Sequence, residues 1–167
     1  MKLETIEKIL NFLKEKEGMK LPREWVKLIK PKIIKELETH PDGTQYRYEG
    51  DLDLDGANIT KLPNDLYVDG MLDLDDCERL TKLPNKLYVV GNLSLSDTNI
   101  EELPTKLYVG NYLNISYTNI TELPNKLYVG GDLYIYSTPL ADKYTDKQIR
   151  EIVASTGGQI IGDIIRF

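Results

Sequence analysis

Apolar and polar residues alternate through most of the middle of this chain. Between Leu127 and Ile135, Leu, Val, Gly and Ile occupy every second position, and Tyr, Gly and Asp lie between them. A period of two is typical of a β-strand that buries one of its faces. The spacing predicts one strand here and one strand in each matching segment upstream.

This segment belongs to a repeat that occurs four times. The copies begin at Leu62, Leu83, Leu103 and Leu123; three are twenty residues long, and the first has one extra residue. An earlier, degraded copy ends in residues 50–61. One copy cannot bury its own apolar side, so the copies must stack, strand beside strand. We therefore expect a solenoid with a parallel sheet along one side.

Each strand segment is followed by a column of small or hydrogen-bonding residues and then by a proline. Small residues fit a tight buried turn, and the fixed φ of proline favours an extended or turn backbone over a helix. No coil is therefore expected to contain a long helix. The small column contains Ala57, Cys77, Thr98, Thr118 and Thr138, and the prolines are Pro63, Pro84, Pro104 and Pro124.

The repeat resembles the short bacterial form of the leucine-rich repeat, LPxxLxxLxVxxNxL. The match includes Leu103, Leu113 and Ile115, whereas Thr118 stands where that family usually has Asn or Cys. The resemblance implies an α/β solenoid over residues 41–140, a leucine-rich-repeat stack of five to six coils whose concave sheet face binds a partner. The segment LYVGGDLYI and the tail of the chain resemble small repeat proteins of bacteriophages.

Both ends of the repeat are expected to be closed, because the terminal coils of an open solenoid would expose the core. Residues 1–40 carry apolar residues at helical spacing and predict a helical N-terminal cap. Residues 141–167 predict a helix-strand C-terminal cap, in which Thr145 and Gln148 form a capping box and Arg166 lies at an inward position of a final strand. An arginine fits that position only where no further coil follows. The three segments are expected to form one folding unit.

Composition limits the chemistry that this chain can perform. Its 167 residues include one Cys and one His, which excludes an internal disulfide framework and any site that needs two imidazoles. The first sixteen residues contain no apolar run long enough for a signal peptide or a spanning helix. We therefore expect no membrane association and a cytoplasmic location, the host cytoplasm if the chain is phage-encoded.

The net charge of −6 arises from the repeat region. Residues 41–140 contain sixteen Asp and Glu residues but seven Lys and Arg residues. Such a surface repels phosphate backbones and attracts basic protein surfaces. We expect a protein partner with a basic patch and no direct nucleic-acid binding.

The outward positions of the predicted strands grade from acidic to aromatic. Like charges on adjacent strands repel, and a cluster tolerated at that cost is typical of a surface for cations or basic side chains. Tyrosines flanked by short polar residues are typical of protein-recognition surfaces. The candidate binding residues are Asp51, Asp53, Asp55, Asp73, Asp75 and Asp76 at the acidic end, and Tyr112, Asn114, Tyr117, Tyr134, Tyr136 and Phe167 at the aromatic end.

Three other features are interpreted as structural. Residues 51–56 read D-x-D-x-D-G like the start of an EF-hand loop, but the twelfth position is Leu62 and the alternation turns the aspartates outward on a sheet. Cys77 lies in the small column and His40 precedes Pro41, so we expect no catalytic pair. A column of tyrosines is expected to form a stacked ladder. Its members are Tyr67, Tyr88, Tyr108 and Tyr128.

These observations favour a non-enzymatic protein-binding module with no catalytic residue, cofactor or metal. A phage-encoded inhibitor of a host protein is one form of this hypothesis. The alternative is a structural or assembly component that self-associates or joins a virion or a larger complex. A ligase adaptor is disfavoured because only twenty-seven residues follow position 140 and none is a cysteine. The binding hypothesis expects a monomer, whereas the assembly hypothesis expects self-association.

Overall fold

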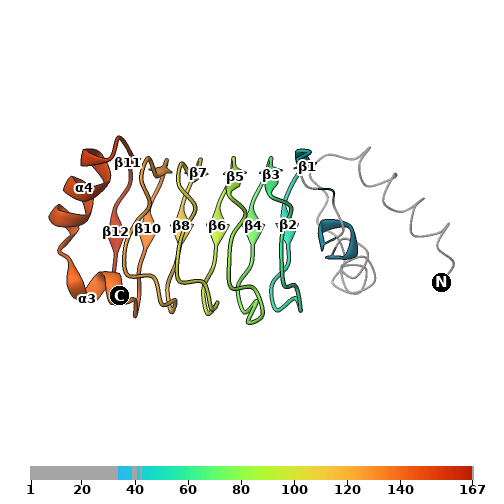
Figure 1. Ribbon diagram of the computed structural model, residues 1–167. Coiled ribbons are helices and arrows are strands. Elements are labelled where there is room, and N and C mark those ends of the chain that lie inside the picture. The colour runs from blue at the N-terminus through green and yellow to red at the C-terminus, as the bar shows by residue number, and fades with distance from the viewer. Residues whose placement is uncertain (1–33, 39–40, 42, 167) are drawn as a thin grey trace, which may run out of the picture. The chain divides into compact units, whose positions relative to one another are not determined.

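The computed structural model describes residues 34–38, 41 and 43–166 (Figure 1). The chain divides into two compact units, Met1–Glu36 and Leu37–Phe167. Residues 34–38 are helical, and the rest of the predicted N-terminal cap lies outside the described residues.

The second unit is a β-solenoid whose strands form two parallel sheets of six strands each among the described residues. Every repeat contributes one strand to each sheet, and Figure 1 shows these strands following one another along the stack. Sheet A consists of β1 (Tyr46–Tyr48), β3 (Asp65–Val68), β5 (Lys86–Val89), β7 (Tyr108–Val109), β9 (Tyr128–Val129) and β11 (Gln159–Ile160). Sheet B consists of β2 (Leu52–Asp53), β4 (Leu72–Asp73), β6 (Leu93–Ser94), β8 (Leu113–Asn114), β10 (Leu133–Tyr134) and β12 (Ile164–Ile165).

The prediction of one strand per repeat and one sheet is wrong, because the chain turns a corner between the two strands. Glycines lie at this corner, where neighbouring coils approach closely. A Cβ on Gly91 would lie 2.7 Å from the carbonyl carbon of Gly70 in the preceding coil. The glycine in the V-x-G-x-L pattern therefore separates two short strands instead of lying within one long strand.

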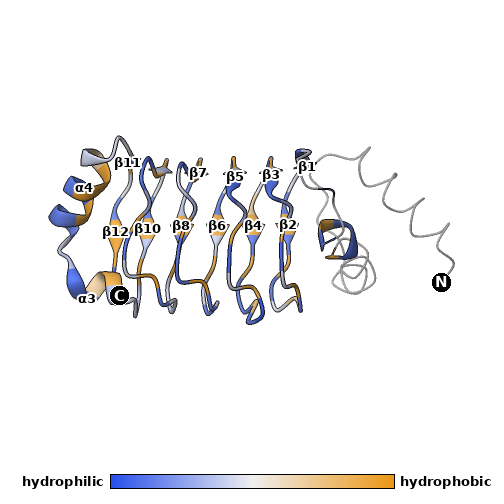
Figure 2. Cartoon of the chain, in the orientation of Figure 1, coloured by the Kyte–Doolittle hydropathy of each residue, from blue (hydrophilic) through white to orange (hydrophobic). Residues whose placement is uncertain are grey.

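The predicted burial of one strand face in a stack of coils is confirmed for the leucines of sheet B. Leu72, Leu93 and Leu113 pair in register on adjacent strands of sheet B, and their side chains are completely buried. Figure 2 shows this file as hydrophobic residues that recur along the strands of sheet B. Because the same layer is filled in every coil, each coil covers the apolar side of the next.

The small column is also buried as predicted, and its threonines satisfy backbone carbonyls inside the turn. The hydroxyl groups of Thr98, Thr118 and Thr138 are 2.7–2.9 Å from the carbonyl oxygens three residues before them. A buried carbonyl without a donor would destabilise the fold, so each threonine supplies one. Threonine thus fills the place of the Asn or Cys that the resemblance leads one to expect.

Two helices and two strands follow the strands of the last repeat. Helix α3 spans Pro139–Lys143 and helix α4 spans Asp146–Ser155. The predicted capping box of Thr145 and Gln148 is confirmed at the start of α4. After this helix the chain adds β11 to sheet A and β12 to sheet B, so the predicted final strand is divided at the same corner as the repeats. No helix in the described part of the chain is both long and apolar enough to cross a membrane.

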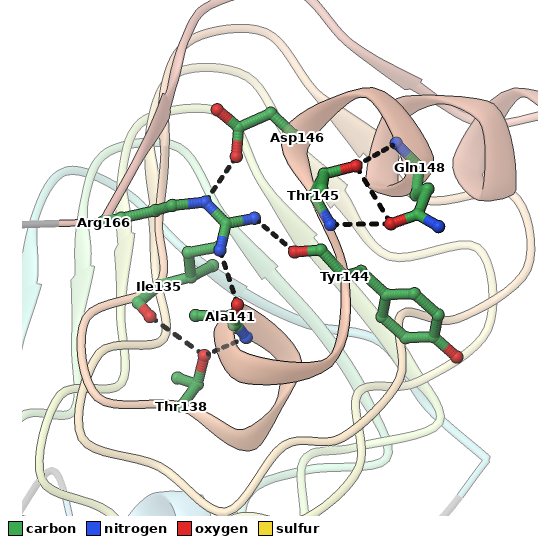
Figure 3. A network of polar contacts seen from close by, with 8 residues as sticks. All are labelled: Ile135, Thr138, Ala141, Tyr144, Thr145, Asp146, Gln148 and Arg166. Atoms are coloured by element: carbon green, nitrogen blue, oxygen red, sulfur yellow. Dashed lines mark hydrogen bonds and ion pairs between the residues drawn. The ribbon is translucent and has the colours of Figure 1, made fainter.

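Arg166 lies at the inward position predicted for it and binds the segment that joins the two helices (Figure 3). Its guanidinium group donates to the carbonyl oxygens of Ala141 and Tyr144 at 2.5 and 2.6 Å and to Asp146 Oδ1 at 2.5 Å. All three acceptors belong to α3, α4 or their connection. In the preceding coils this position is occupied by a buried apolar residue. A charged arginine is accommodated here because the polar groups of the α3–α4 segment bind its guanidinium group.

Candidate functional site

The outer face of sheet B carries nine of the twelve candidate residues, and Asp76 and Tyr117 lie in the turns that follow its strands. Its side chains alternate with the buried leucines, so Asp51, Asp53 and Asp55 are exposed around buried Leu52 and Leu54. Phe167, the twelfth candidate, lies outside the described residues. We use the name outer face of sheet B for Asp51, Asp53, Asp55, Met71, Asp73, Asp75, Asn92, Ser94, Ser96, Tyr112, Asn114, Ser116, Asp132, Tyr134, Tyr136, Asp163 and Ile165.

The acidic end of this face brings carboxylates together on adjacent strands. Asp53 lies directly opposite Asp73 in the parallel register of β2 and β4. Burial raises the pKa of Asp73, and the nearby carboxylates of Asp75, Asp53 and Asp55 raise it further, against the lowering effect of the Asp75 amide. Burial also raises the pKa of Asp75. Both shifts show that negative charge is unfavourable at these positions in the isolated chain.

Several of these aspartates also hold the backbone, which the sequence analysis did not anticipate. Asp53 Oδ1 accepts the amide of Asp55 at 3.1 Å, and Asp73 Oδ1 accepts that of Asp75 at the same distance. Asp75 Oδ1 reaches across to the next coil and accepts the amide of Ser96 at 2.7 Å. These bonds fix the carboxylates at the ends of their strands. The D-x-D spacing is the signal that could have predicted this local turn.

Three carboxylates of the acidic end take part in none of the ion pairs between described residues. The acidic members of the ion pairs between described residues are Asp65, Asp69, Glu122, Asp146 and Glu151. None of them involves Asp73, Asp75 or Asp76. Among the described residues, no group of three or more His, Cys, Asp or Glu side chains is arranged so that it could hold a metal ion.

The aromatic end contains a direct ring contact between neighbouring coils. The rings of Tyr112 and Tyr134 meet edge to face, with centroids 5.6 Å apart at an angle of 77°. Tyr136 lies beside Tyr117, whose amide donates to the Tyr136 carbonyl at 2.8 Å. Ile165 pairs in register with Tyr134, so the predicted register of the closing strand is confirmed as far as this residue.

Tyr117 adopts a backbone conformation that is unusual for its side chain. Its φ is +57°, in the left-handed region, and 55% of the residue is exposed. Gly56, Asp76 and Ser137 occupy the same turn position in other coils, also with positive φ. Glycine and short polar residues tolerate this conformation, whereas a bulky ring is destabilising there. The fold alone therefore gives no reason for a tyrosine at position 117.

The acidic and aromatic ends, which the sequence predicts as two ends of one graded face, meet in its middle. Burial raises the pKa of Tyr112, and the negative charges of Asp73 and Asp75 raise it further. The residue between these strands is small: Ser94 is buried and accepts a hydrogen bond from Asn114 Nδ2 at 3.2 Å. Carboxylates and tyrosine rings therefore border one continuous polar surface. β8, which follows Tyr112, lies two strands from β4, which contains Asp73, and the two strands are about 10 Å apart.

Sheet A carries the predicted tyrosine ladder, which provides a contrast to this face. Tyr67, Tyr88, Tyr108 and Tyr128 stack nearly parallel, with successive centroids 4.8, 4.1 and 4.8 Å apart. The guanidinium group of Arg47 lies 4.7 Å from the centre of the first ring. Stacking occupies the ring faces, which is consistent with a structural role.

The remaining candidate groups do not form a reactive pair in the described residues. Cys77 is buried in the small column, and its thiol donates to the carbonyl oxygen of Leu54 at 3.1 Å. His40 lies outside the described residues. The Cys77 thiol is therefore a packing residue that bonds to the preceding coil.

Comparison of the chain with protein-family models, curated proteins and solved structures found no match.

Proposed function

We propose that this chain is a non-enzymatic protein-binding module of the leucine-rich-repeat type, acting in the cytoplasm and using the outer face of sheet B. The observation that carries the proposal is the continuity of this face. Asp73 and Asp75 border the same surface as Tyr112, which in turn contacts Tyr134. A partner on this face would meet charge and aromatic area together.

The aromatic end has the properties of a binding centre. Tyrosine rings supply large contact areas with few rotatable bonds, so little conformational entropy is lost when they are buried in a complex. Tyr117 is exposed in a backbone conformation that favours glycine. A contact between its ring and a partner would account for a tyrosine at that position.

The acidic end defines the chemistry of the partner. The carboxylates of Asp73 and Asp75 are half-buried, close to other carboxylates, and have no ion pair in the described residues. A lysine or arginine of a partner would relieve this repulsion and accelerate association. The partner is therefore a protein whose basic patch adjoins a surface that accepts tyrosine rings. Competition for such a patch is how a phage-encoded chain of this kind would inhibit a host protein.

An affinity capture with matched baits tests this proposal. The wild-type chain and two variants are immobilised: Tyr134→Ala, which alters the outer face of sheet B, and Tyr88→Ala, which alters the ladder of sheet A. Captured proteins are identified by mass spectrometry. The proposal expects a protein that the wild-type chain and Tyr88→Ala retain and that Tyr134→Ala loses.

Two results would contradict the proposal. One is a set of captured proteins that is the same for all three baits, because the face would then play no part. The other is that the chain captures itself and light scattering shows self-association, which is the result that the assembly alternative expects.

A further inference from the structure

In sheet A, each coil donates backbone amides to two carbonyl oxygens of the coil before it. Val129 accepts the amide of Ile161, and Gly131 accepts the amide of Gly162, both at 2.9 Å. The same two positions accept an amide in every earlier coil. The acceptors are Tyr48, Val68, Val89, Val109 and Val129 in one series, and Gly50, Gly70, Gly91, Asn111 and Gly131 in the other.

The next acceptors in the two series are the carbonyl oxygens of Ile160 and Gly162. Ile160 pairs in register with Val129, and Gly162 follows Gly131 at the corner. The amides of a further coil would bind these two oxygens. In the described chain β11 is the last strand of sheet A, so the oxygens face outward from an edge strand.

Arg150 of α4 supplies both of the missing donors. Its Nη1 donates to the carbonyl oxygen of Ile160 at 2.9 Å, and its Nη2 donates to that of Gly162 at 2.5 Å. The planar fork of one guanidinium group thus takes the place of two backbone amides. This side chain is part-buried and engages both oxygens from the helix that packs on β11.

The position of Arg150 on α4 couples this contact to the packing of the helix. Ile149, its neighbour in the sequence, and Val153 are the buried residues of α4. If Arg150 were absent, the two carbonyl oxygens beneath the helix would lack donors, and helix opening would expose them to water. The arginine therefore favours the state in which α4 covers the edge.

We propose that Arg150 holds α4 over the β11 edge and so prevents this edge from pairing with the same edge of a second copy. Two identical edges placed antiparallel are complementary, and their pairing closes after two copies. Ile161, the residue after β11, is 53% exposed and would add apolar burial to such a pair. This inference concerns the opposite sheet from the proposed binding face and does not depend on it.

The oligomeric state of Arg150→Ala tests the proposal. We expect wild-type protein to remain monomeric in multi-angle light scattering, and Arg150→Ala to approach about twice that mass as its concentration rises. Hydrogen exchange should be faster in α4 of the variant than in wild-type α4. Arg79→Ala is the matched control, because it removes the same charge from an exposed side chain whose described partner is Asn58.

Two further variants identify the surface that pairs. Adding Ile161→Lys to Arg150→Ala should restore the monomer, because a lysine beside an edge strand opposes pairing. Arg150→Lys keeps the charge but has one amino group in place of the fork, so its association should be intermediate.

The proposal is overturned if Arg150→Ala is folded and stays monomeric over the concentrations tested, or if its dimer persists with Ile161→Lys. Loss of the folded state in both Arg150→Ala and Arg150→Lys would also overturn it, because the arginine would then be required to form the edge and not to cover it.

Discussion

Asp53 and Asp73 lie directly opposite each other on adjacent parallel strands of sheet B. Each also accepts the amide two residues after it, so both carboxylates are fixed in this arrangement. Changing both to Asn keeps the Oδ1 acceptors and removes two charges. We expect the free energy of unfolding to stay the same or to increase, because like charges opposite each other are destabilising.

The same double variant should bind the captured partner more slowly. Removing charge from the rim of an interface lowers the association rate and makes it less sensitive to salt. Surface plasmon resonance at several salt concentrations measures both effects. Changing Glu101 and Glu102 to Gln, exposed carboxylates outside this face, is the control for overall charge. Loss of folding in the Asn variant, or an unchanged association rate, would contradict this account of the acidic end.

The raised pKa values of Asp73 and Asp75 predict a pH dependence with a definite sign. Both carboxyls have pKa values above the ordinary 3.8, because burial disfavours their charged forms. A group with a raised pKa in the folded chain stabilises fully below its unfolded value, and the stabilisation is lost as pH rises through the folded value. The wild-type chain should therefore lose stability relative to Asp73→Asn/Asp75→Asn as pH rises above 3.8.

Denaturant titrations of both proteins across this range measure the difference in unfolding free energy. Asp65 has a lowered pKa because Lys86 binds it, and its stabilisation is instead lost as pH falls. Because both proteins contain Asp65, its effect cancels from the difference. A difference that does not change with pH would show that the two carboxyls are not destabilised by folding.

We predict that Tyr117 lowers the stability of the fold and increases the affinity for the partner. Replacing it with glycine removes a bulky residue from the left-handed region, which should stabilise the fold by about 1 kcal/mol. The variant should bind the captured partner at least roughly fivefold more weakly, because an exposed ring is removed from the turn beside the face. Ser137→Gly changes the same turn position in the next coil and should improve stability without weakening binding. Thermal denaturation measures the stability of both variants, and calorimetric titration measures their affinity for the captured partner.

The stacked coils predict that the leucines of the central coils contribute much of the free energy of unfolding. Leu113 is completely buried between the layers of Leu93 and Leu133. Leu113→Ala should reduce the free energy of unfolding by about 2–5 kcal/mol, through lost burial and the cavity that remains. Val90→Ala is a control, because Val90 is 42% exposed. Equal and small losses in the two variants would be inconsistent with a stacked core.

The sequence predicted which residues are buried more successfully than how the backbone runs. Alternation identified the inward column that includes Leu93 and Leu113, because burial depends on side-chain period, which repeats preserve. It did not reveal the corner at Gly91, because a glycine in an alternating pattern fits both a strand interior and a break between strands. The deciding fact is the close approach of the preceding coil, a contact between residues about twenty positions apart.

The candidate site, too, was predicted from the sequence only in part. Alternation placed Asp73 and Tyr134 on one face, and the structure has them there. It did not predict that Tyr112 lies close enough to Asp73 and Asp75 for their charges to raise its pKa, because that depends on the rotamers of long side chains. Nor did it predict the role of Arg150, which depends on how α4 packs on β11.

The proposed binding face is tested most directly by comparing Tyr134→Ala with Tyr88→Ala in affinity for the captured partner and in melting temperature. Tyr134 lies on the outer face of sheet B, whereas Tyr88 stacks between two rings of the ladder on sheet A. We predict that Tyr134→Ala loses more than about 2 kcal/mol of binding and lowers the melting temperature less than Tyr88→Ala does, because Tyr134 makes one edge-to-face ring contact whereas Tyr88 stacks on two rings. Tyr88→Ala should lose stability, by about 0.5–1.5 kcal/mol for each stacked pair, and bind normally. The reverse result, in which Tyr134→Ala melts earlier but binds like the wild-type chain, would contradict the proposed binding face.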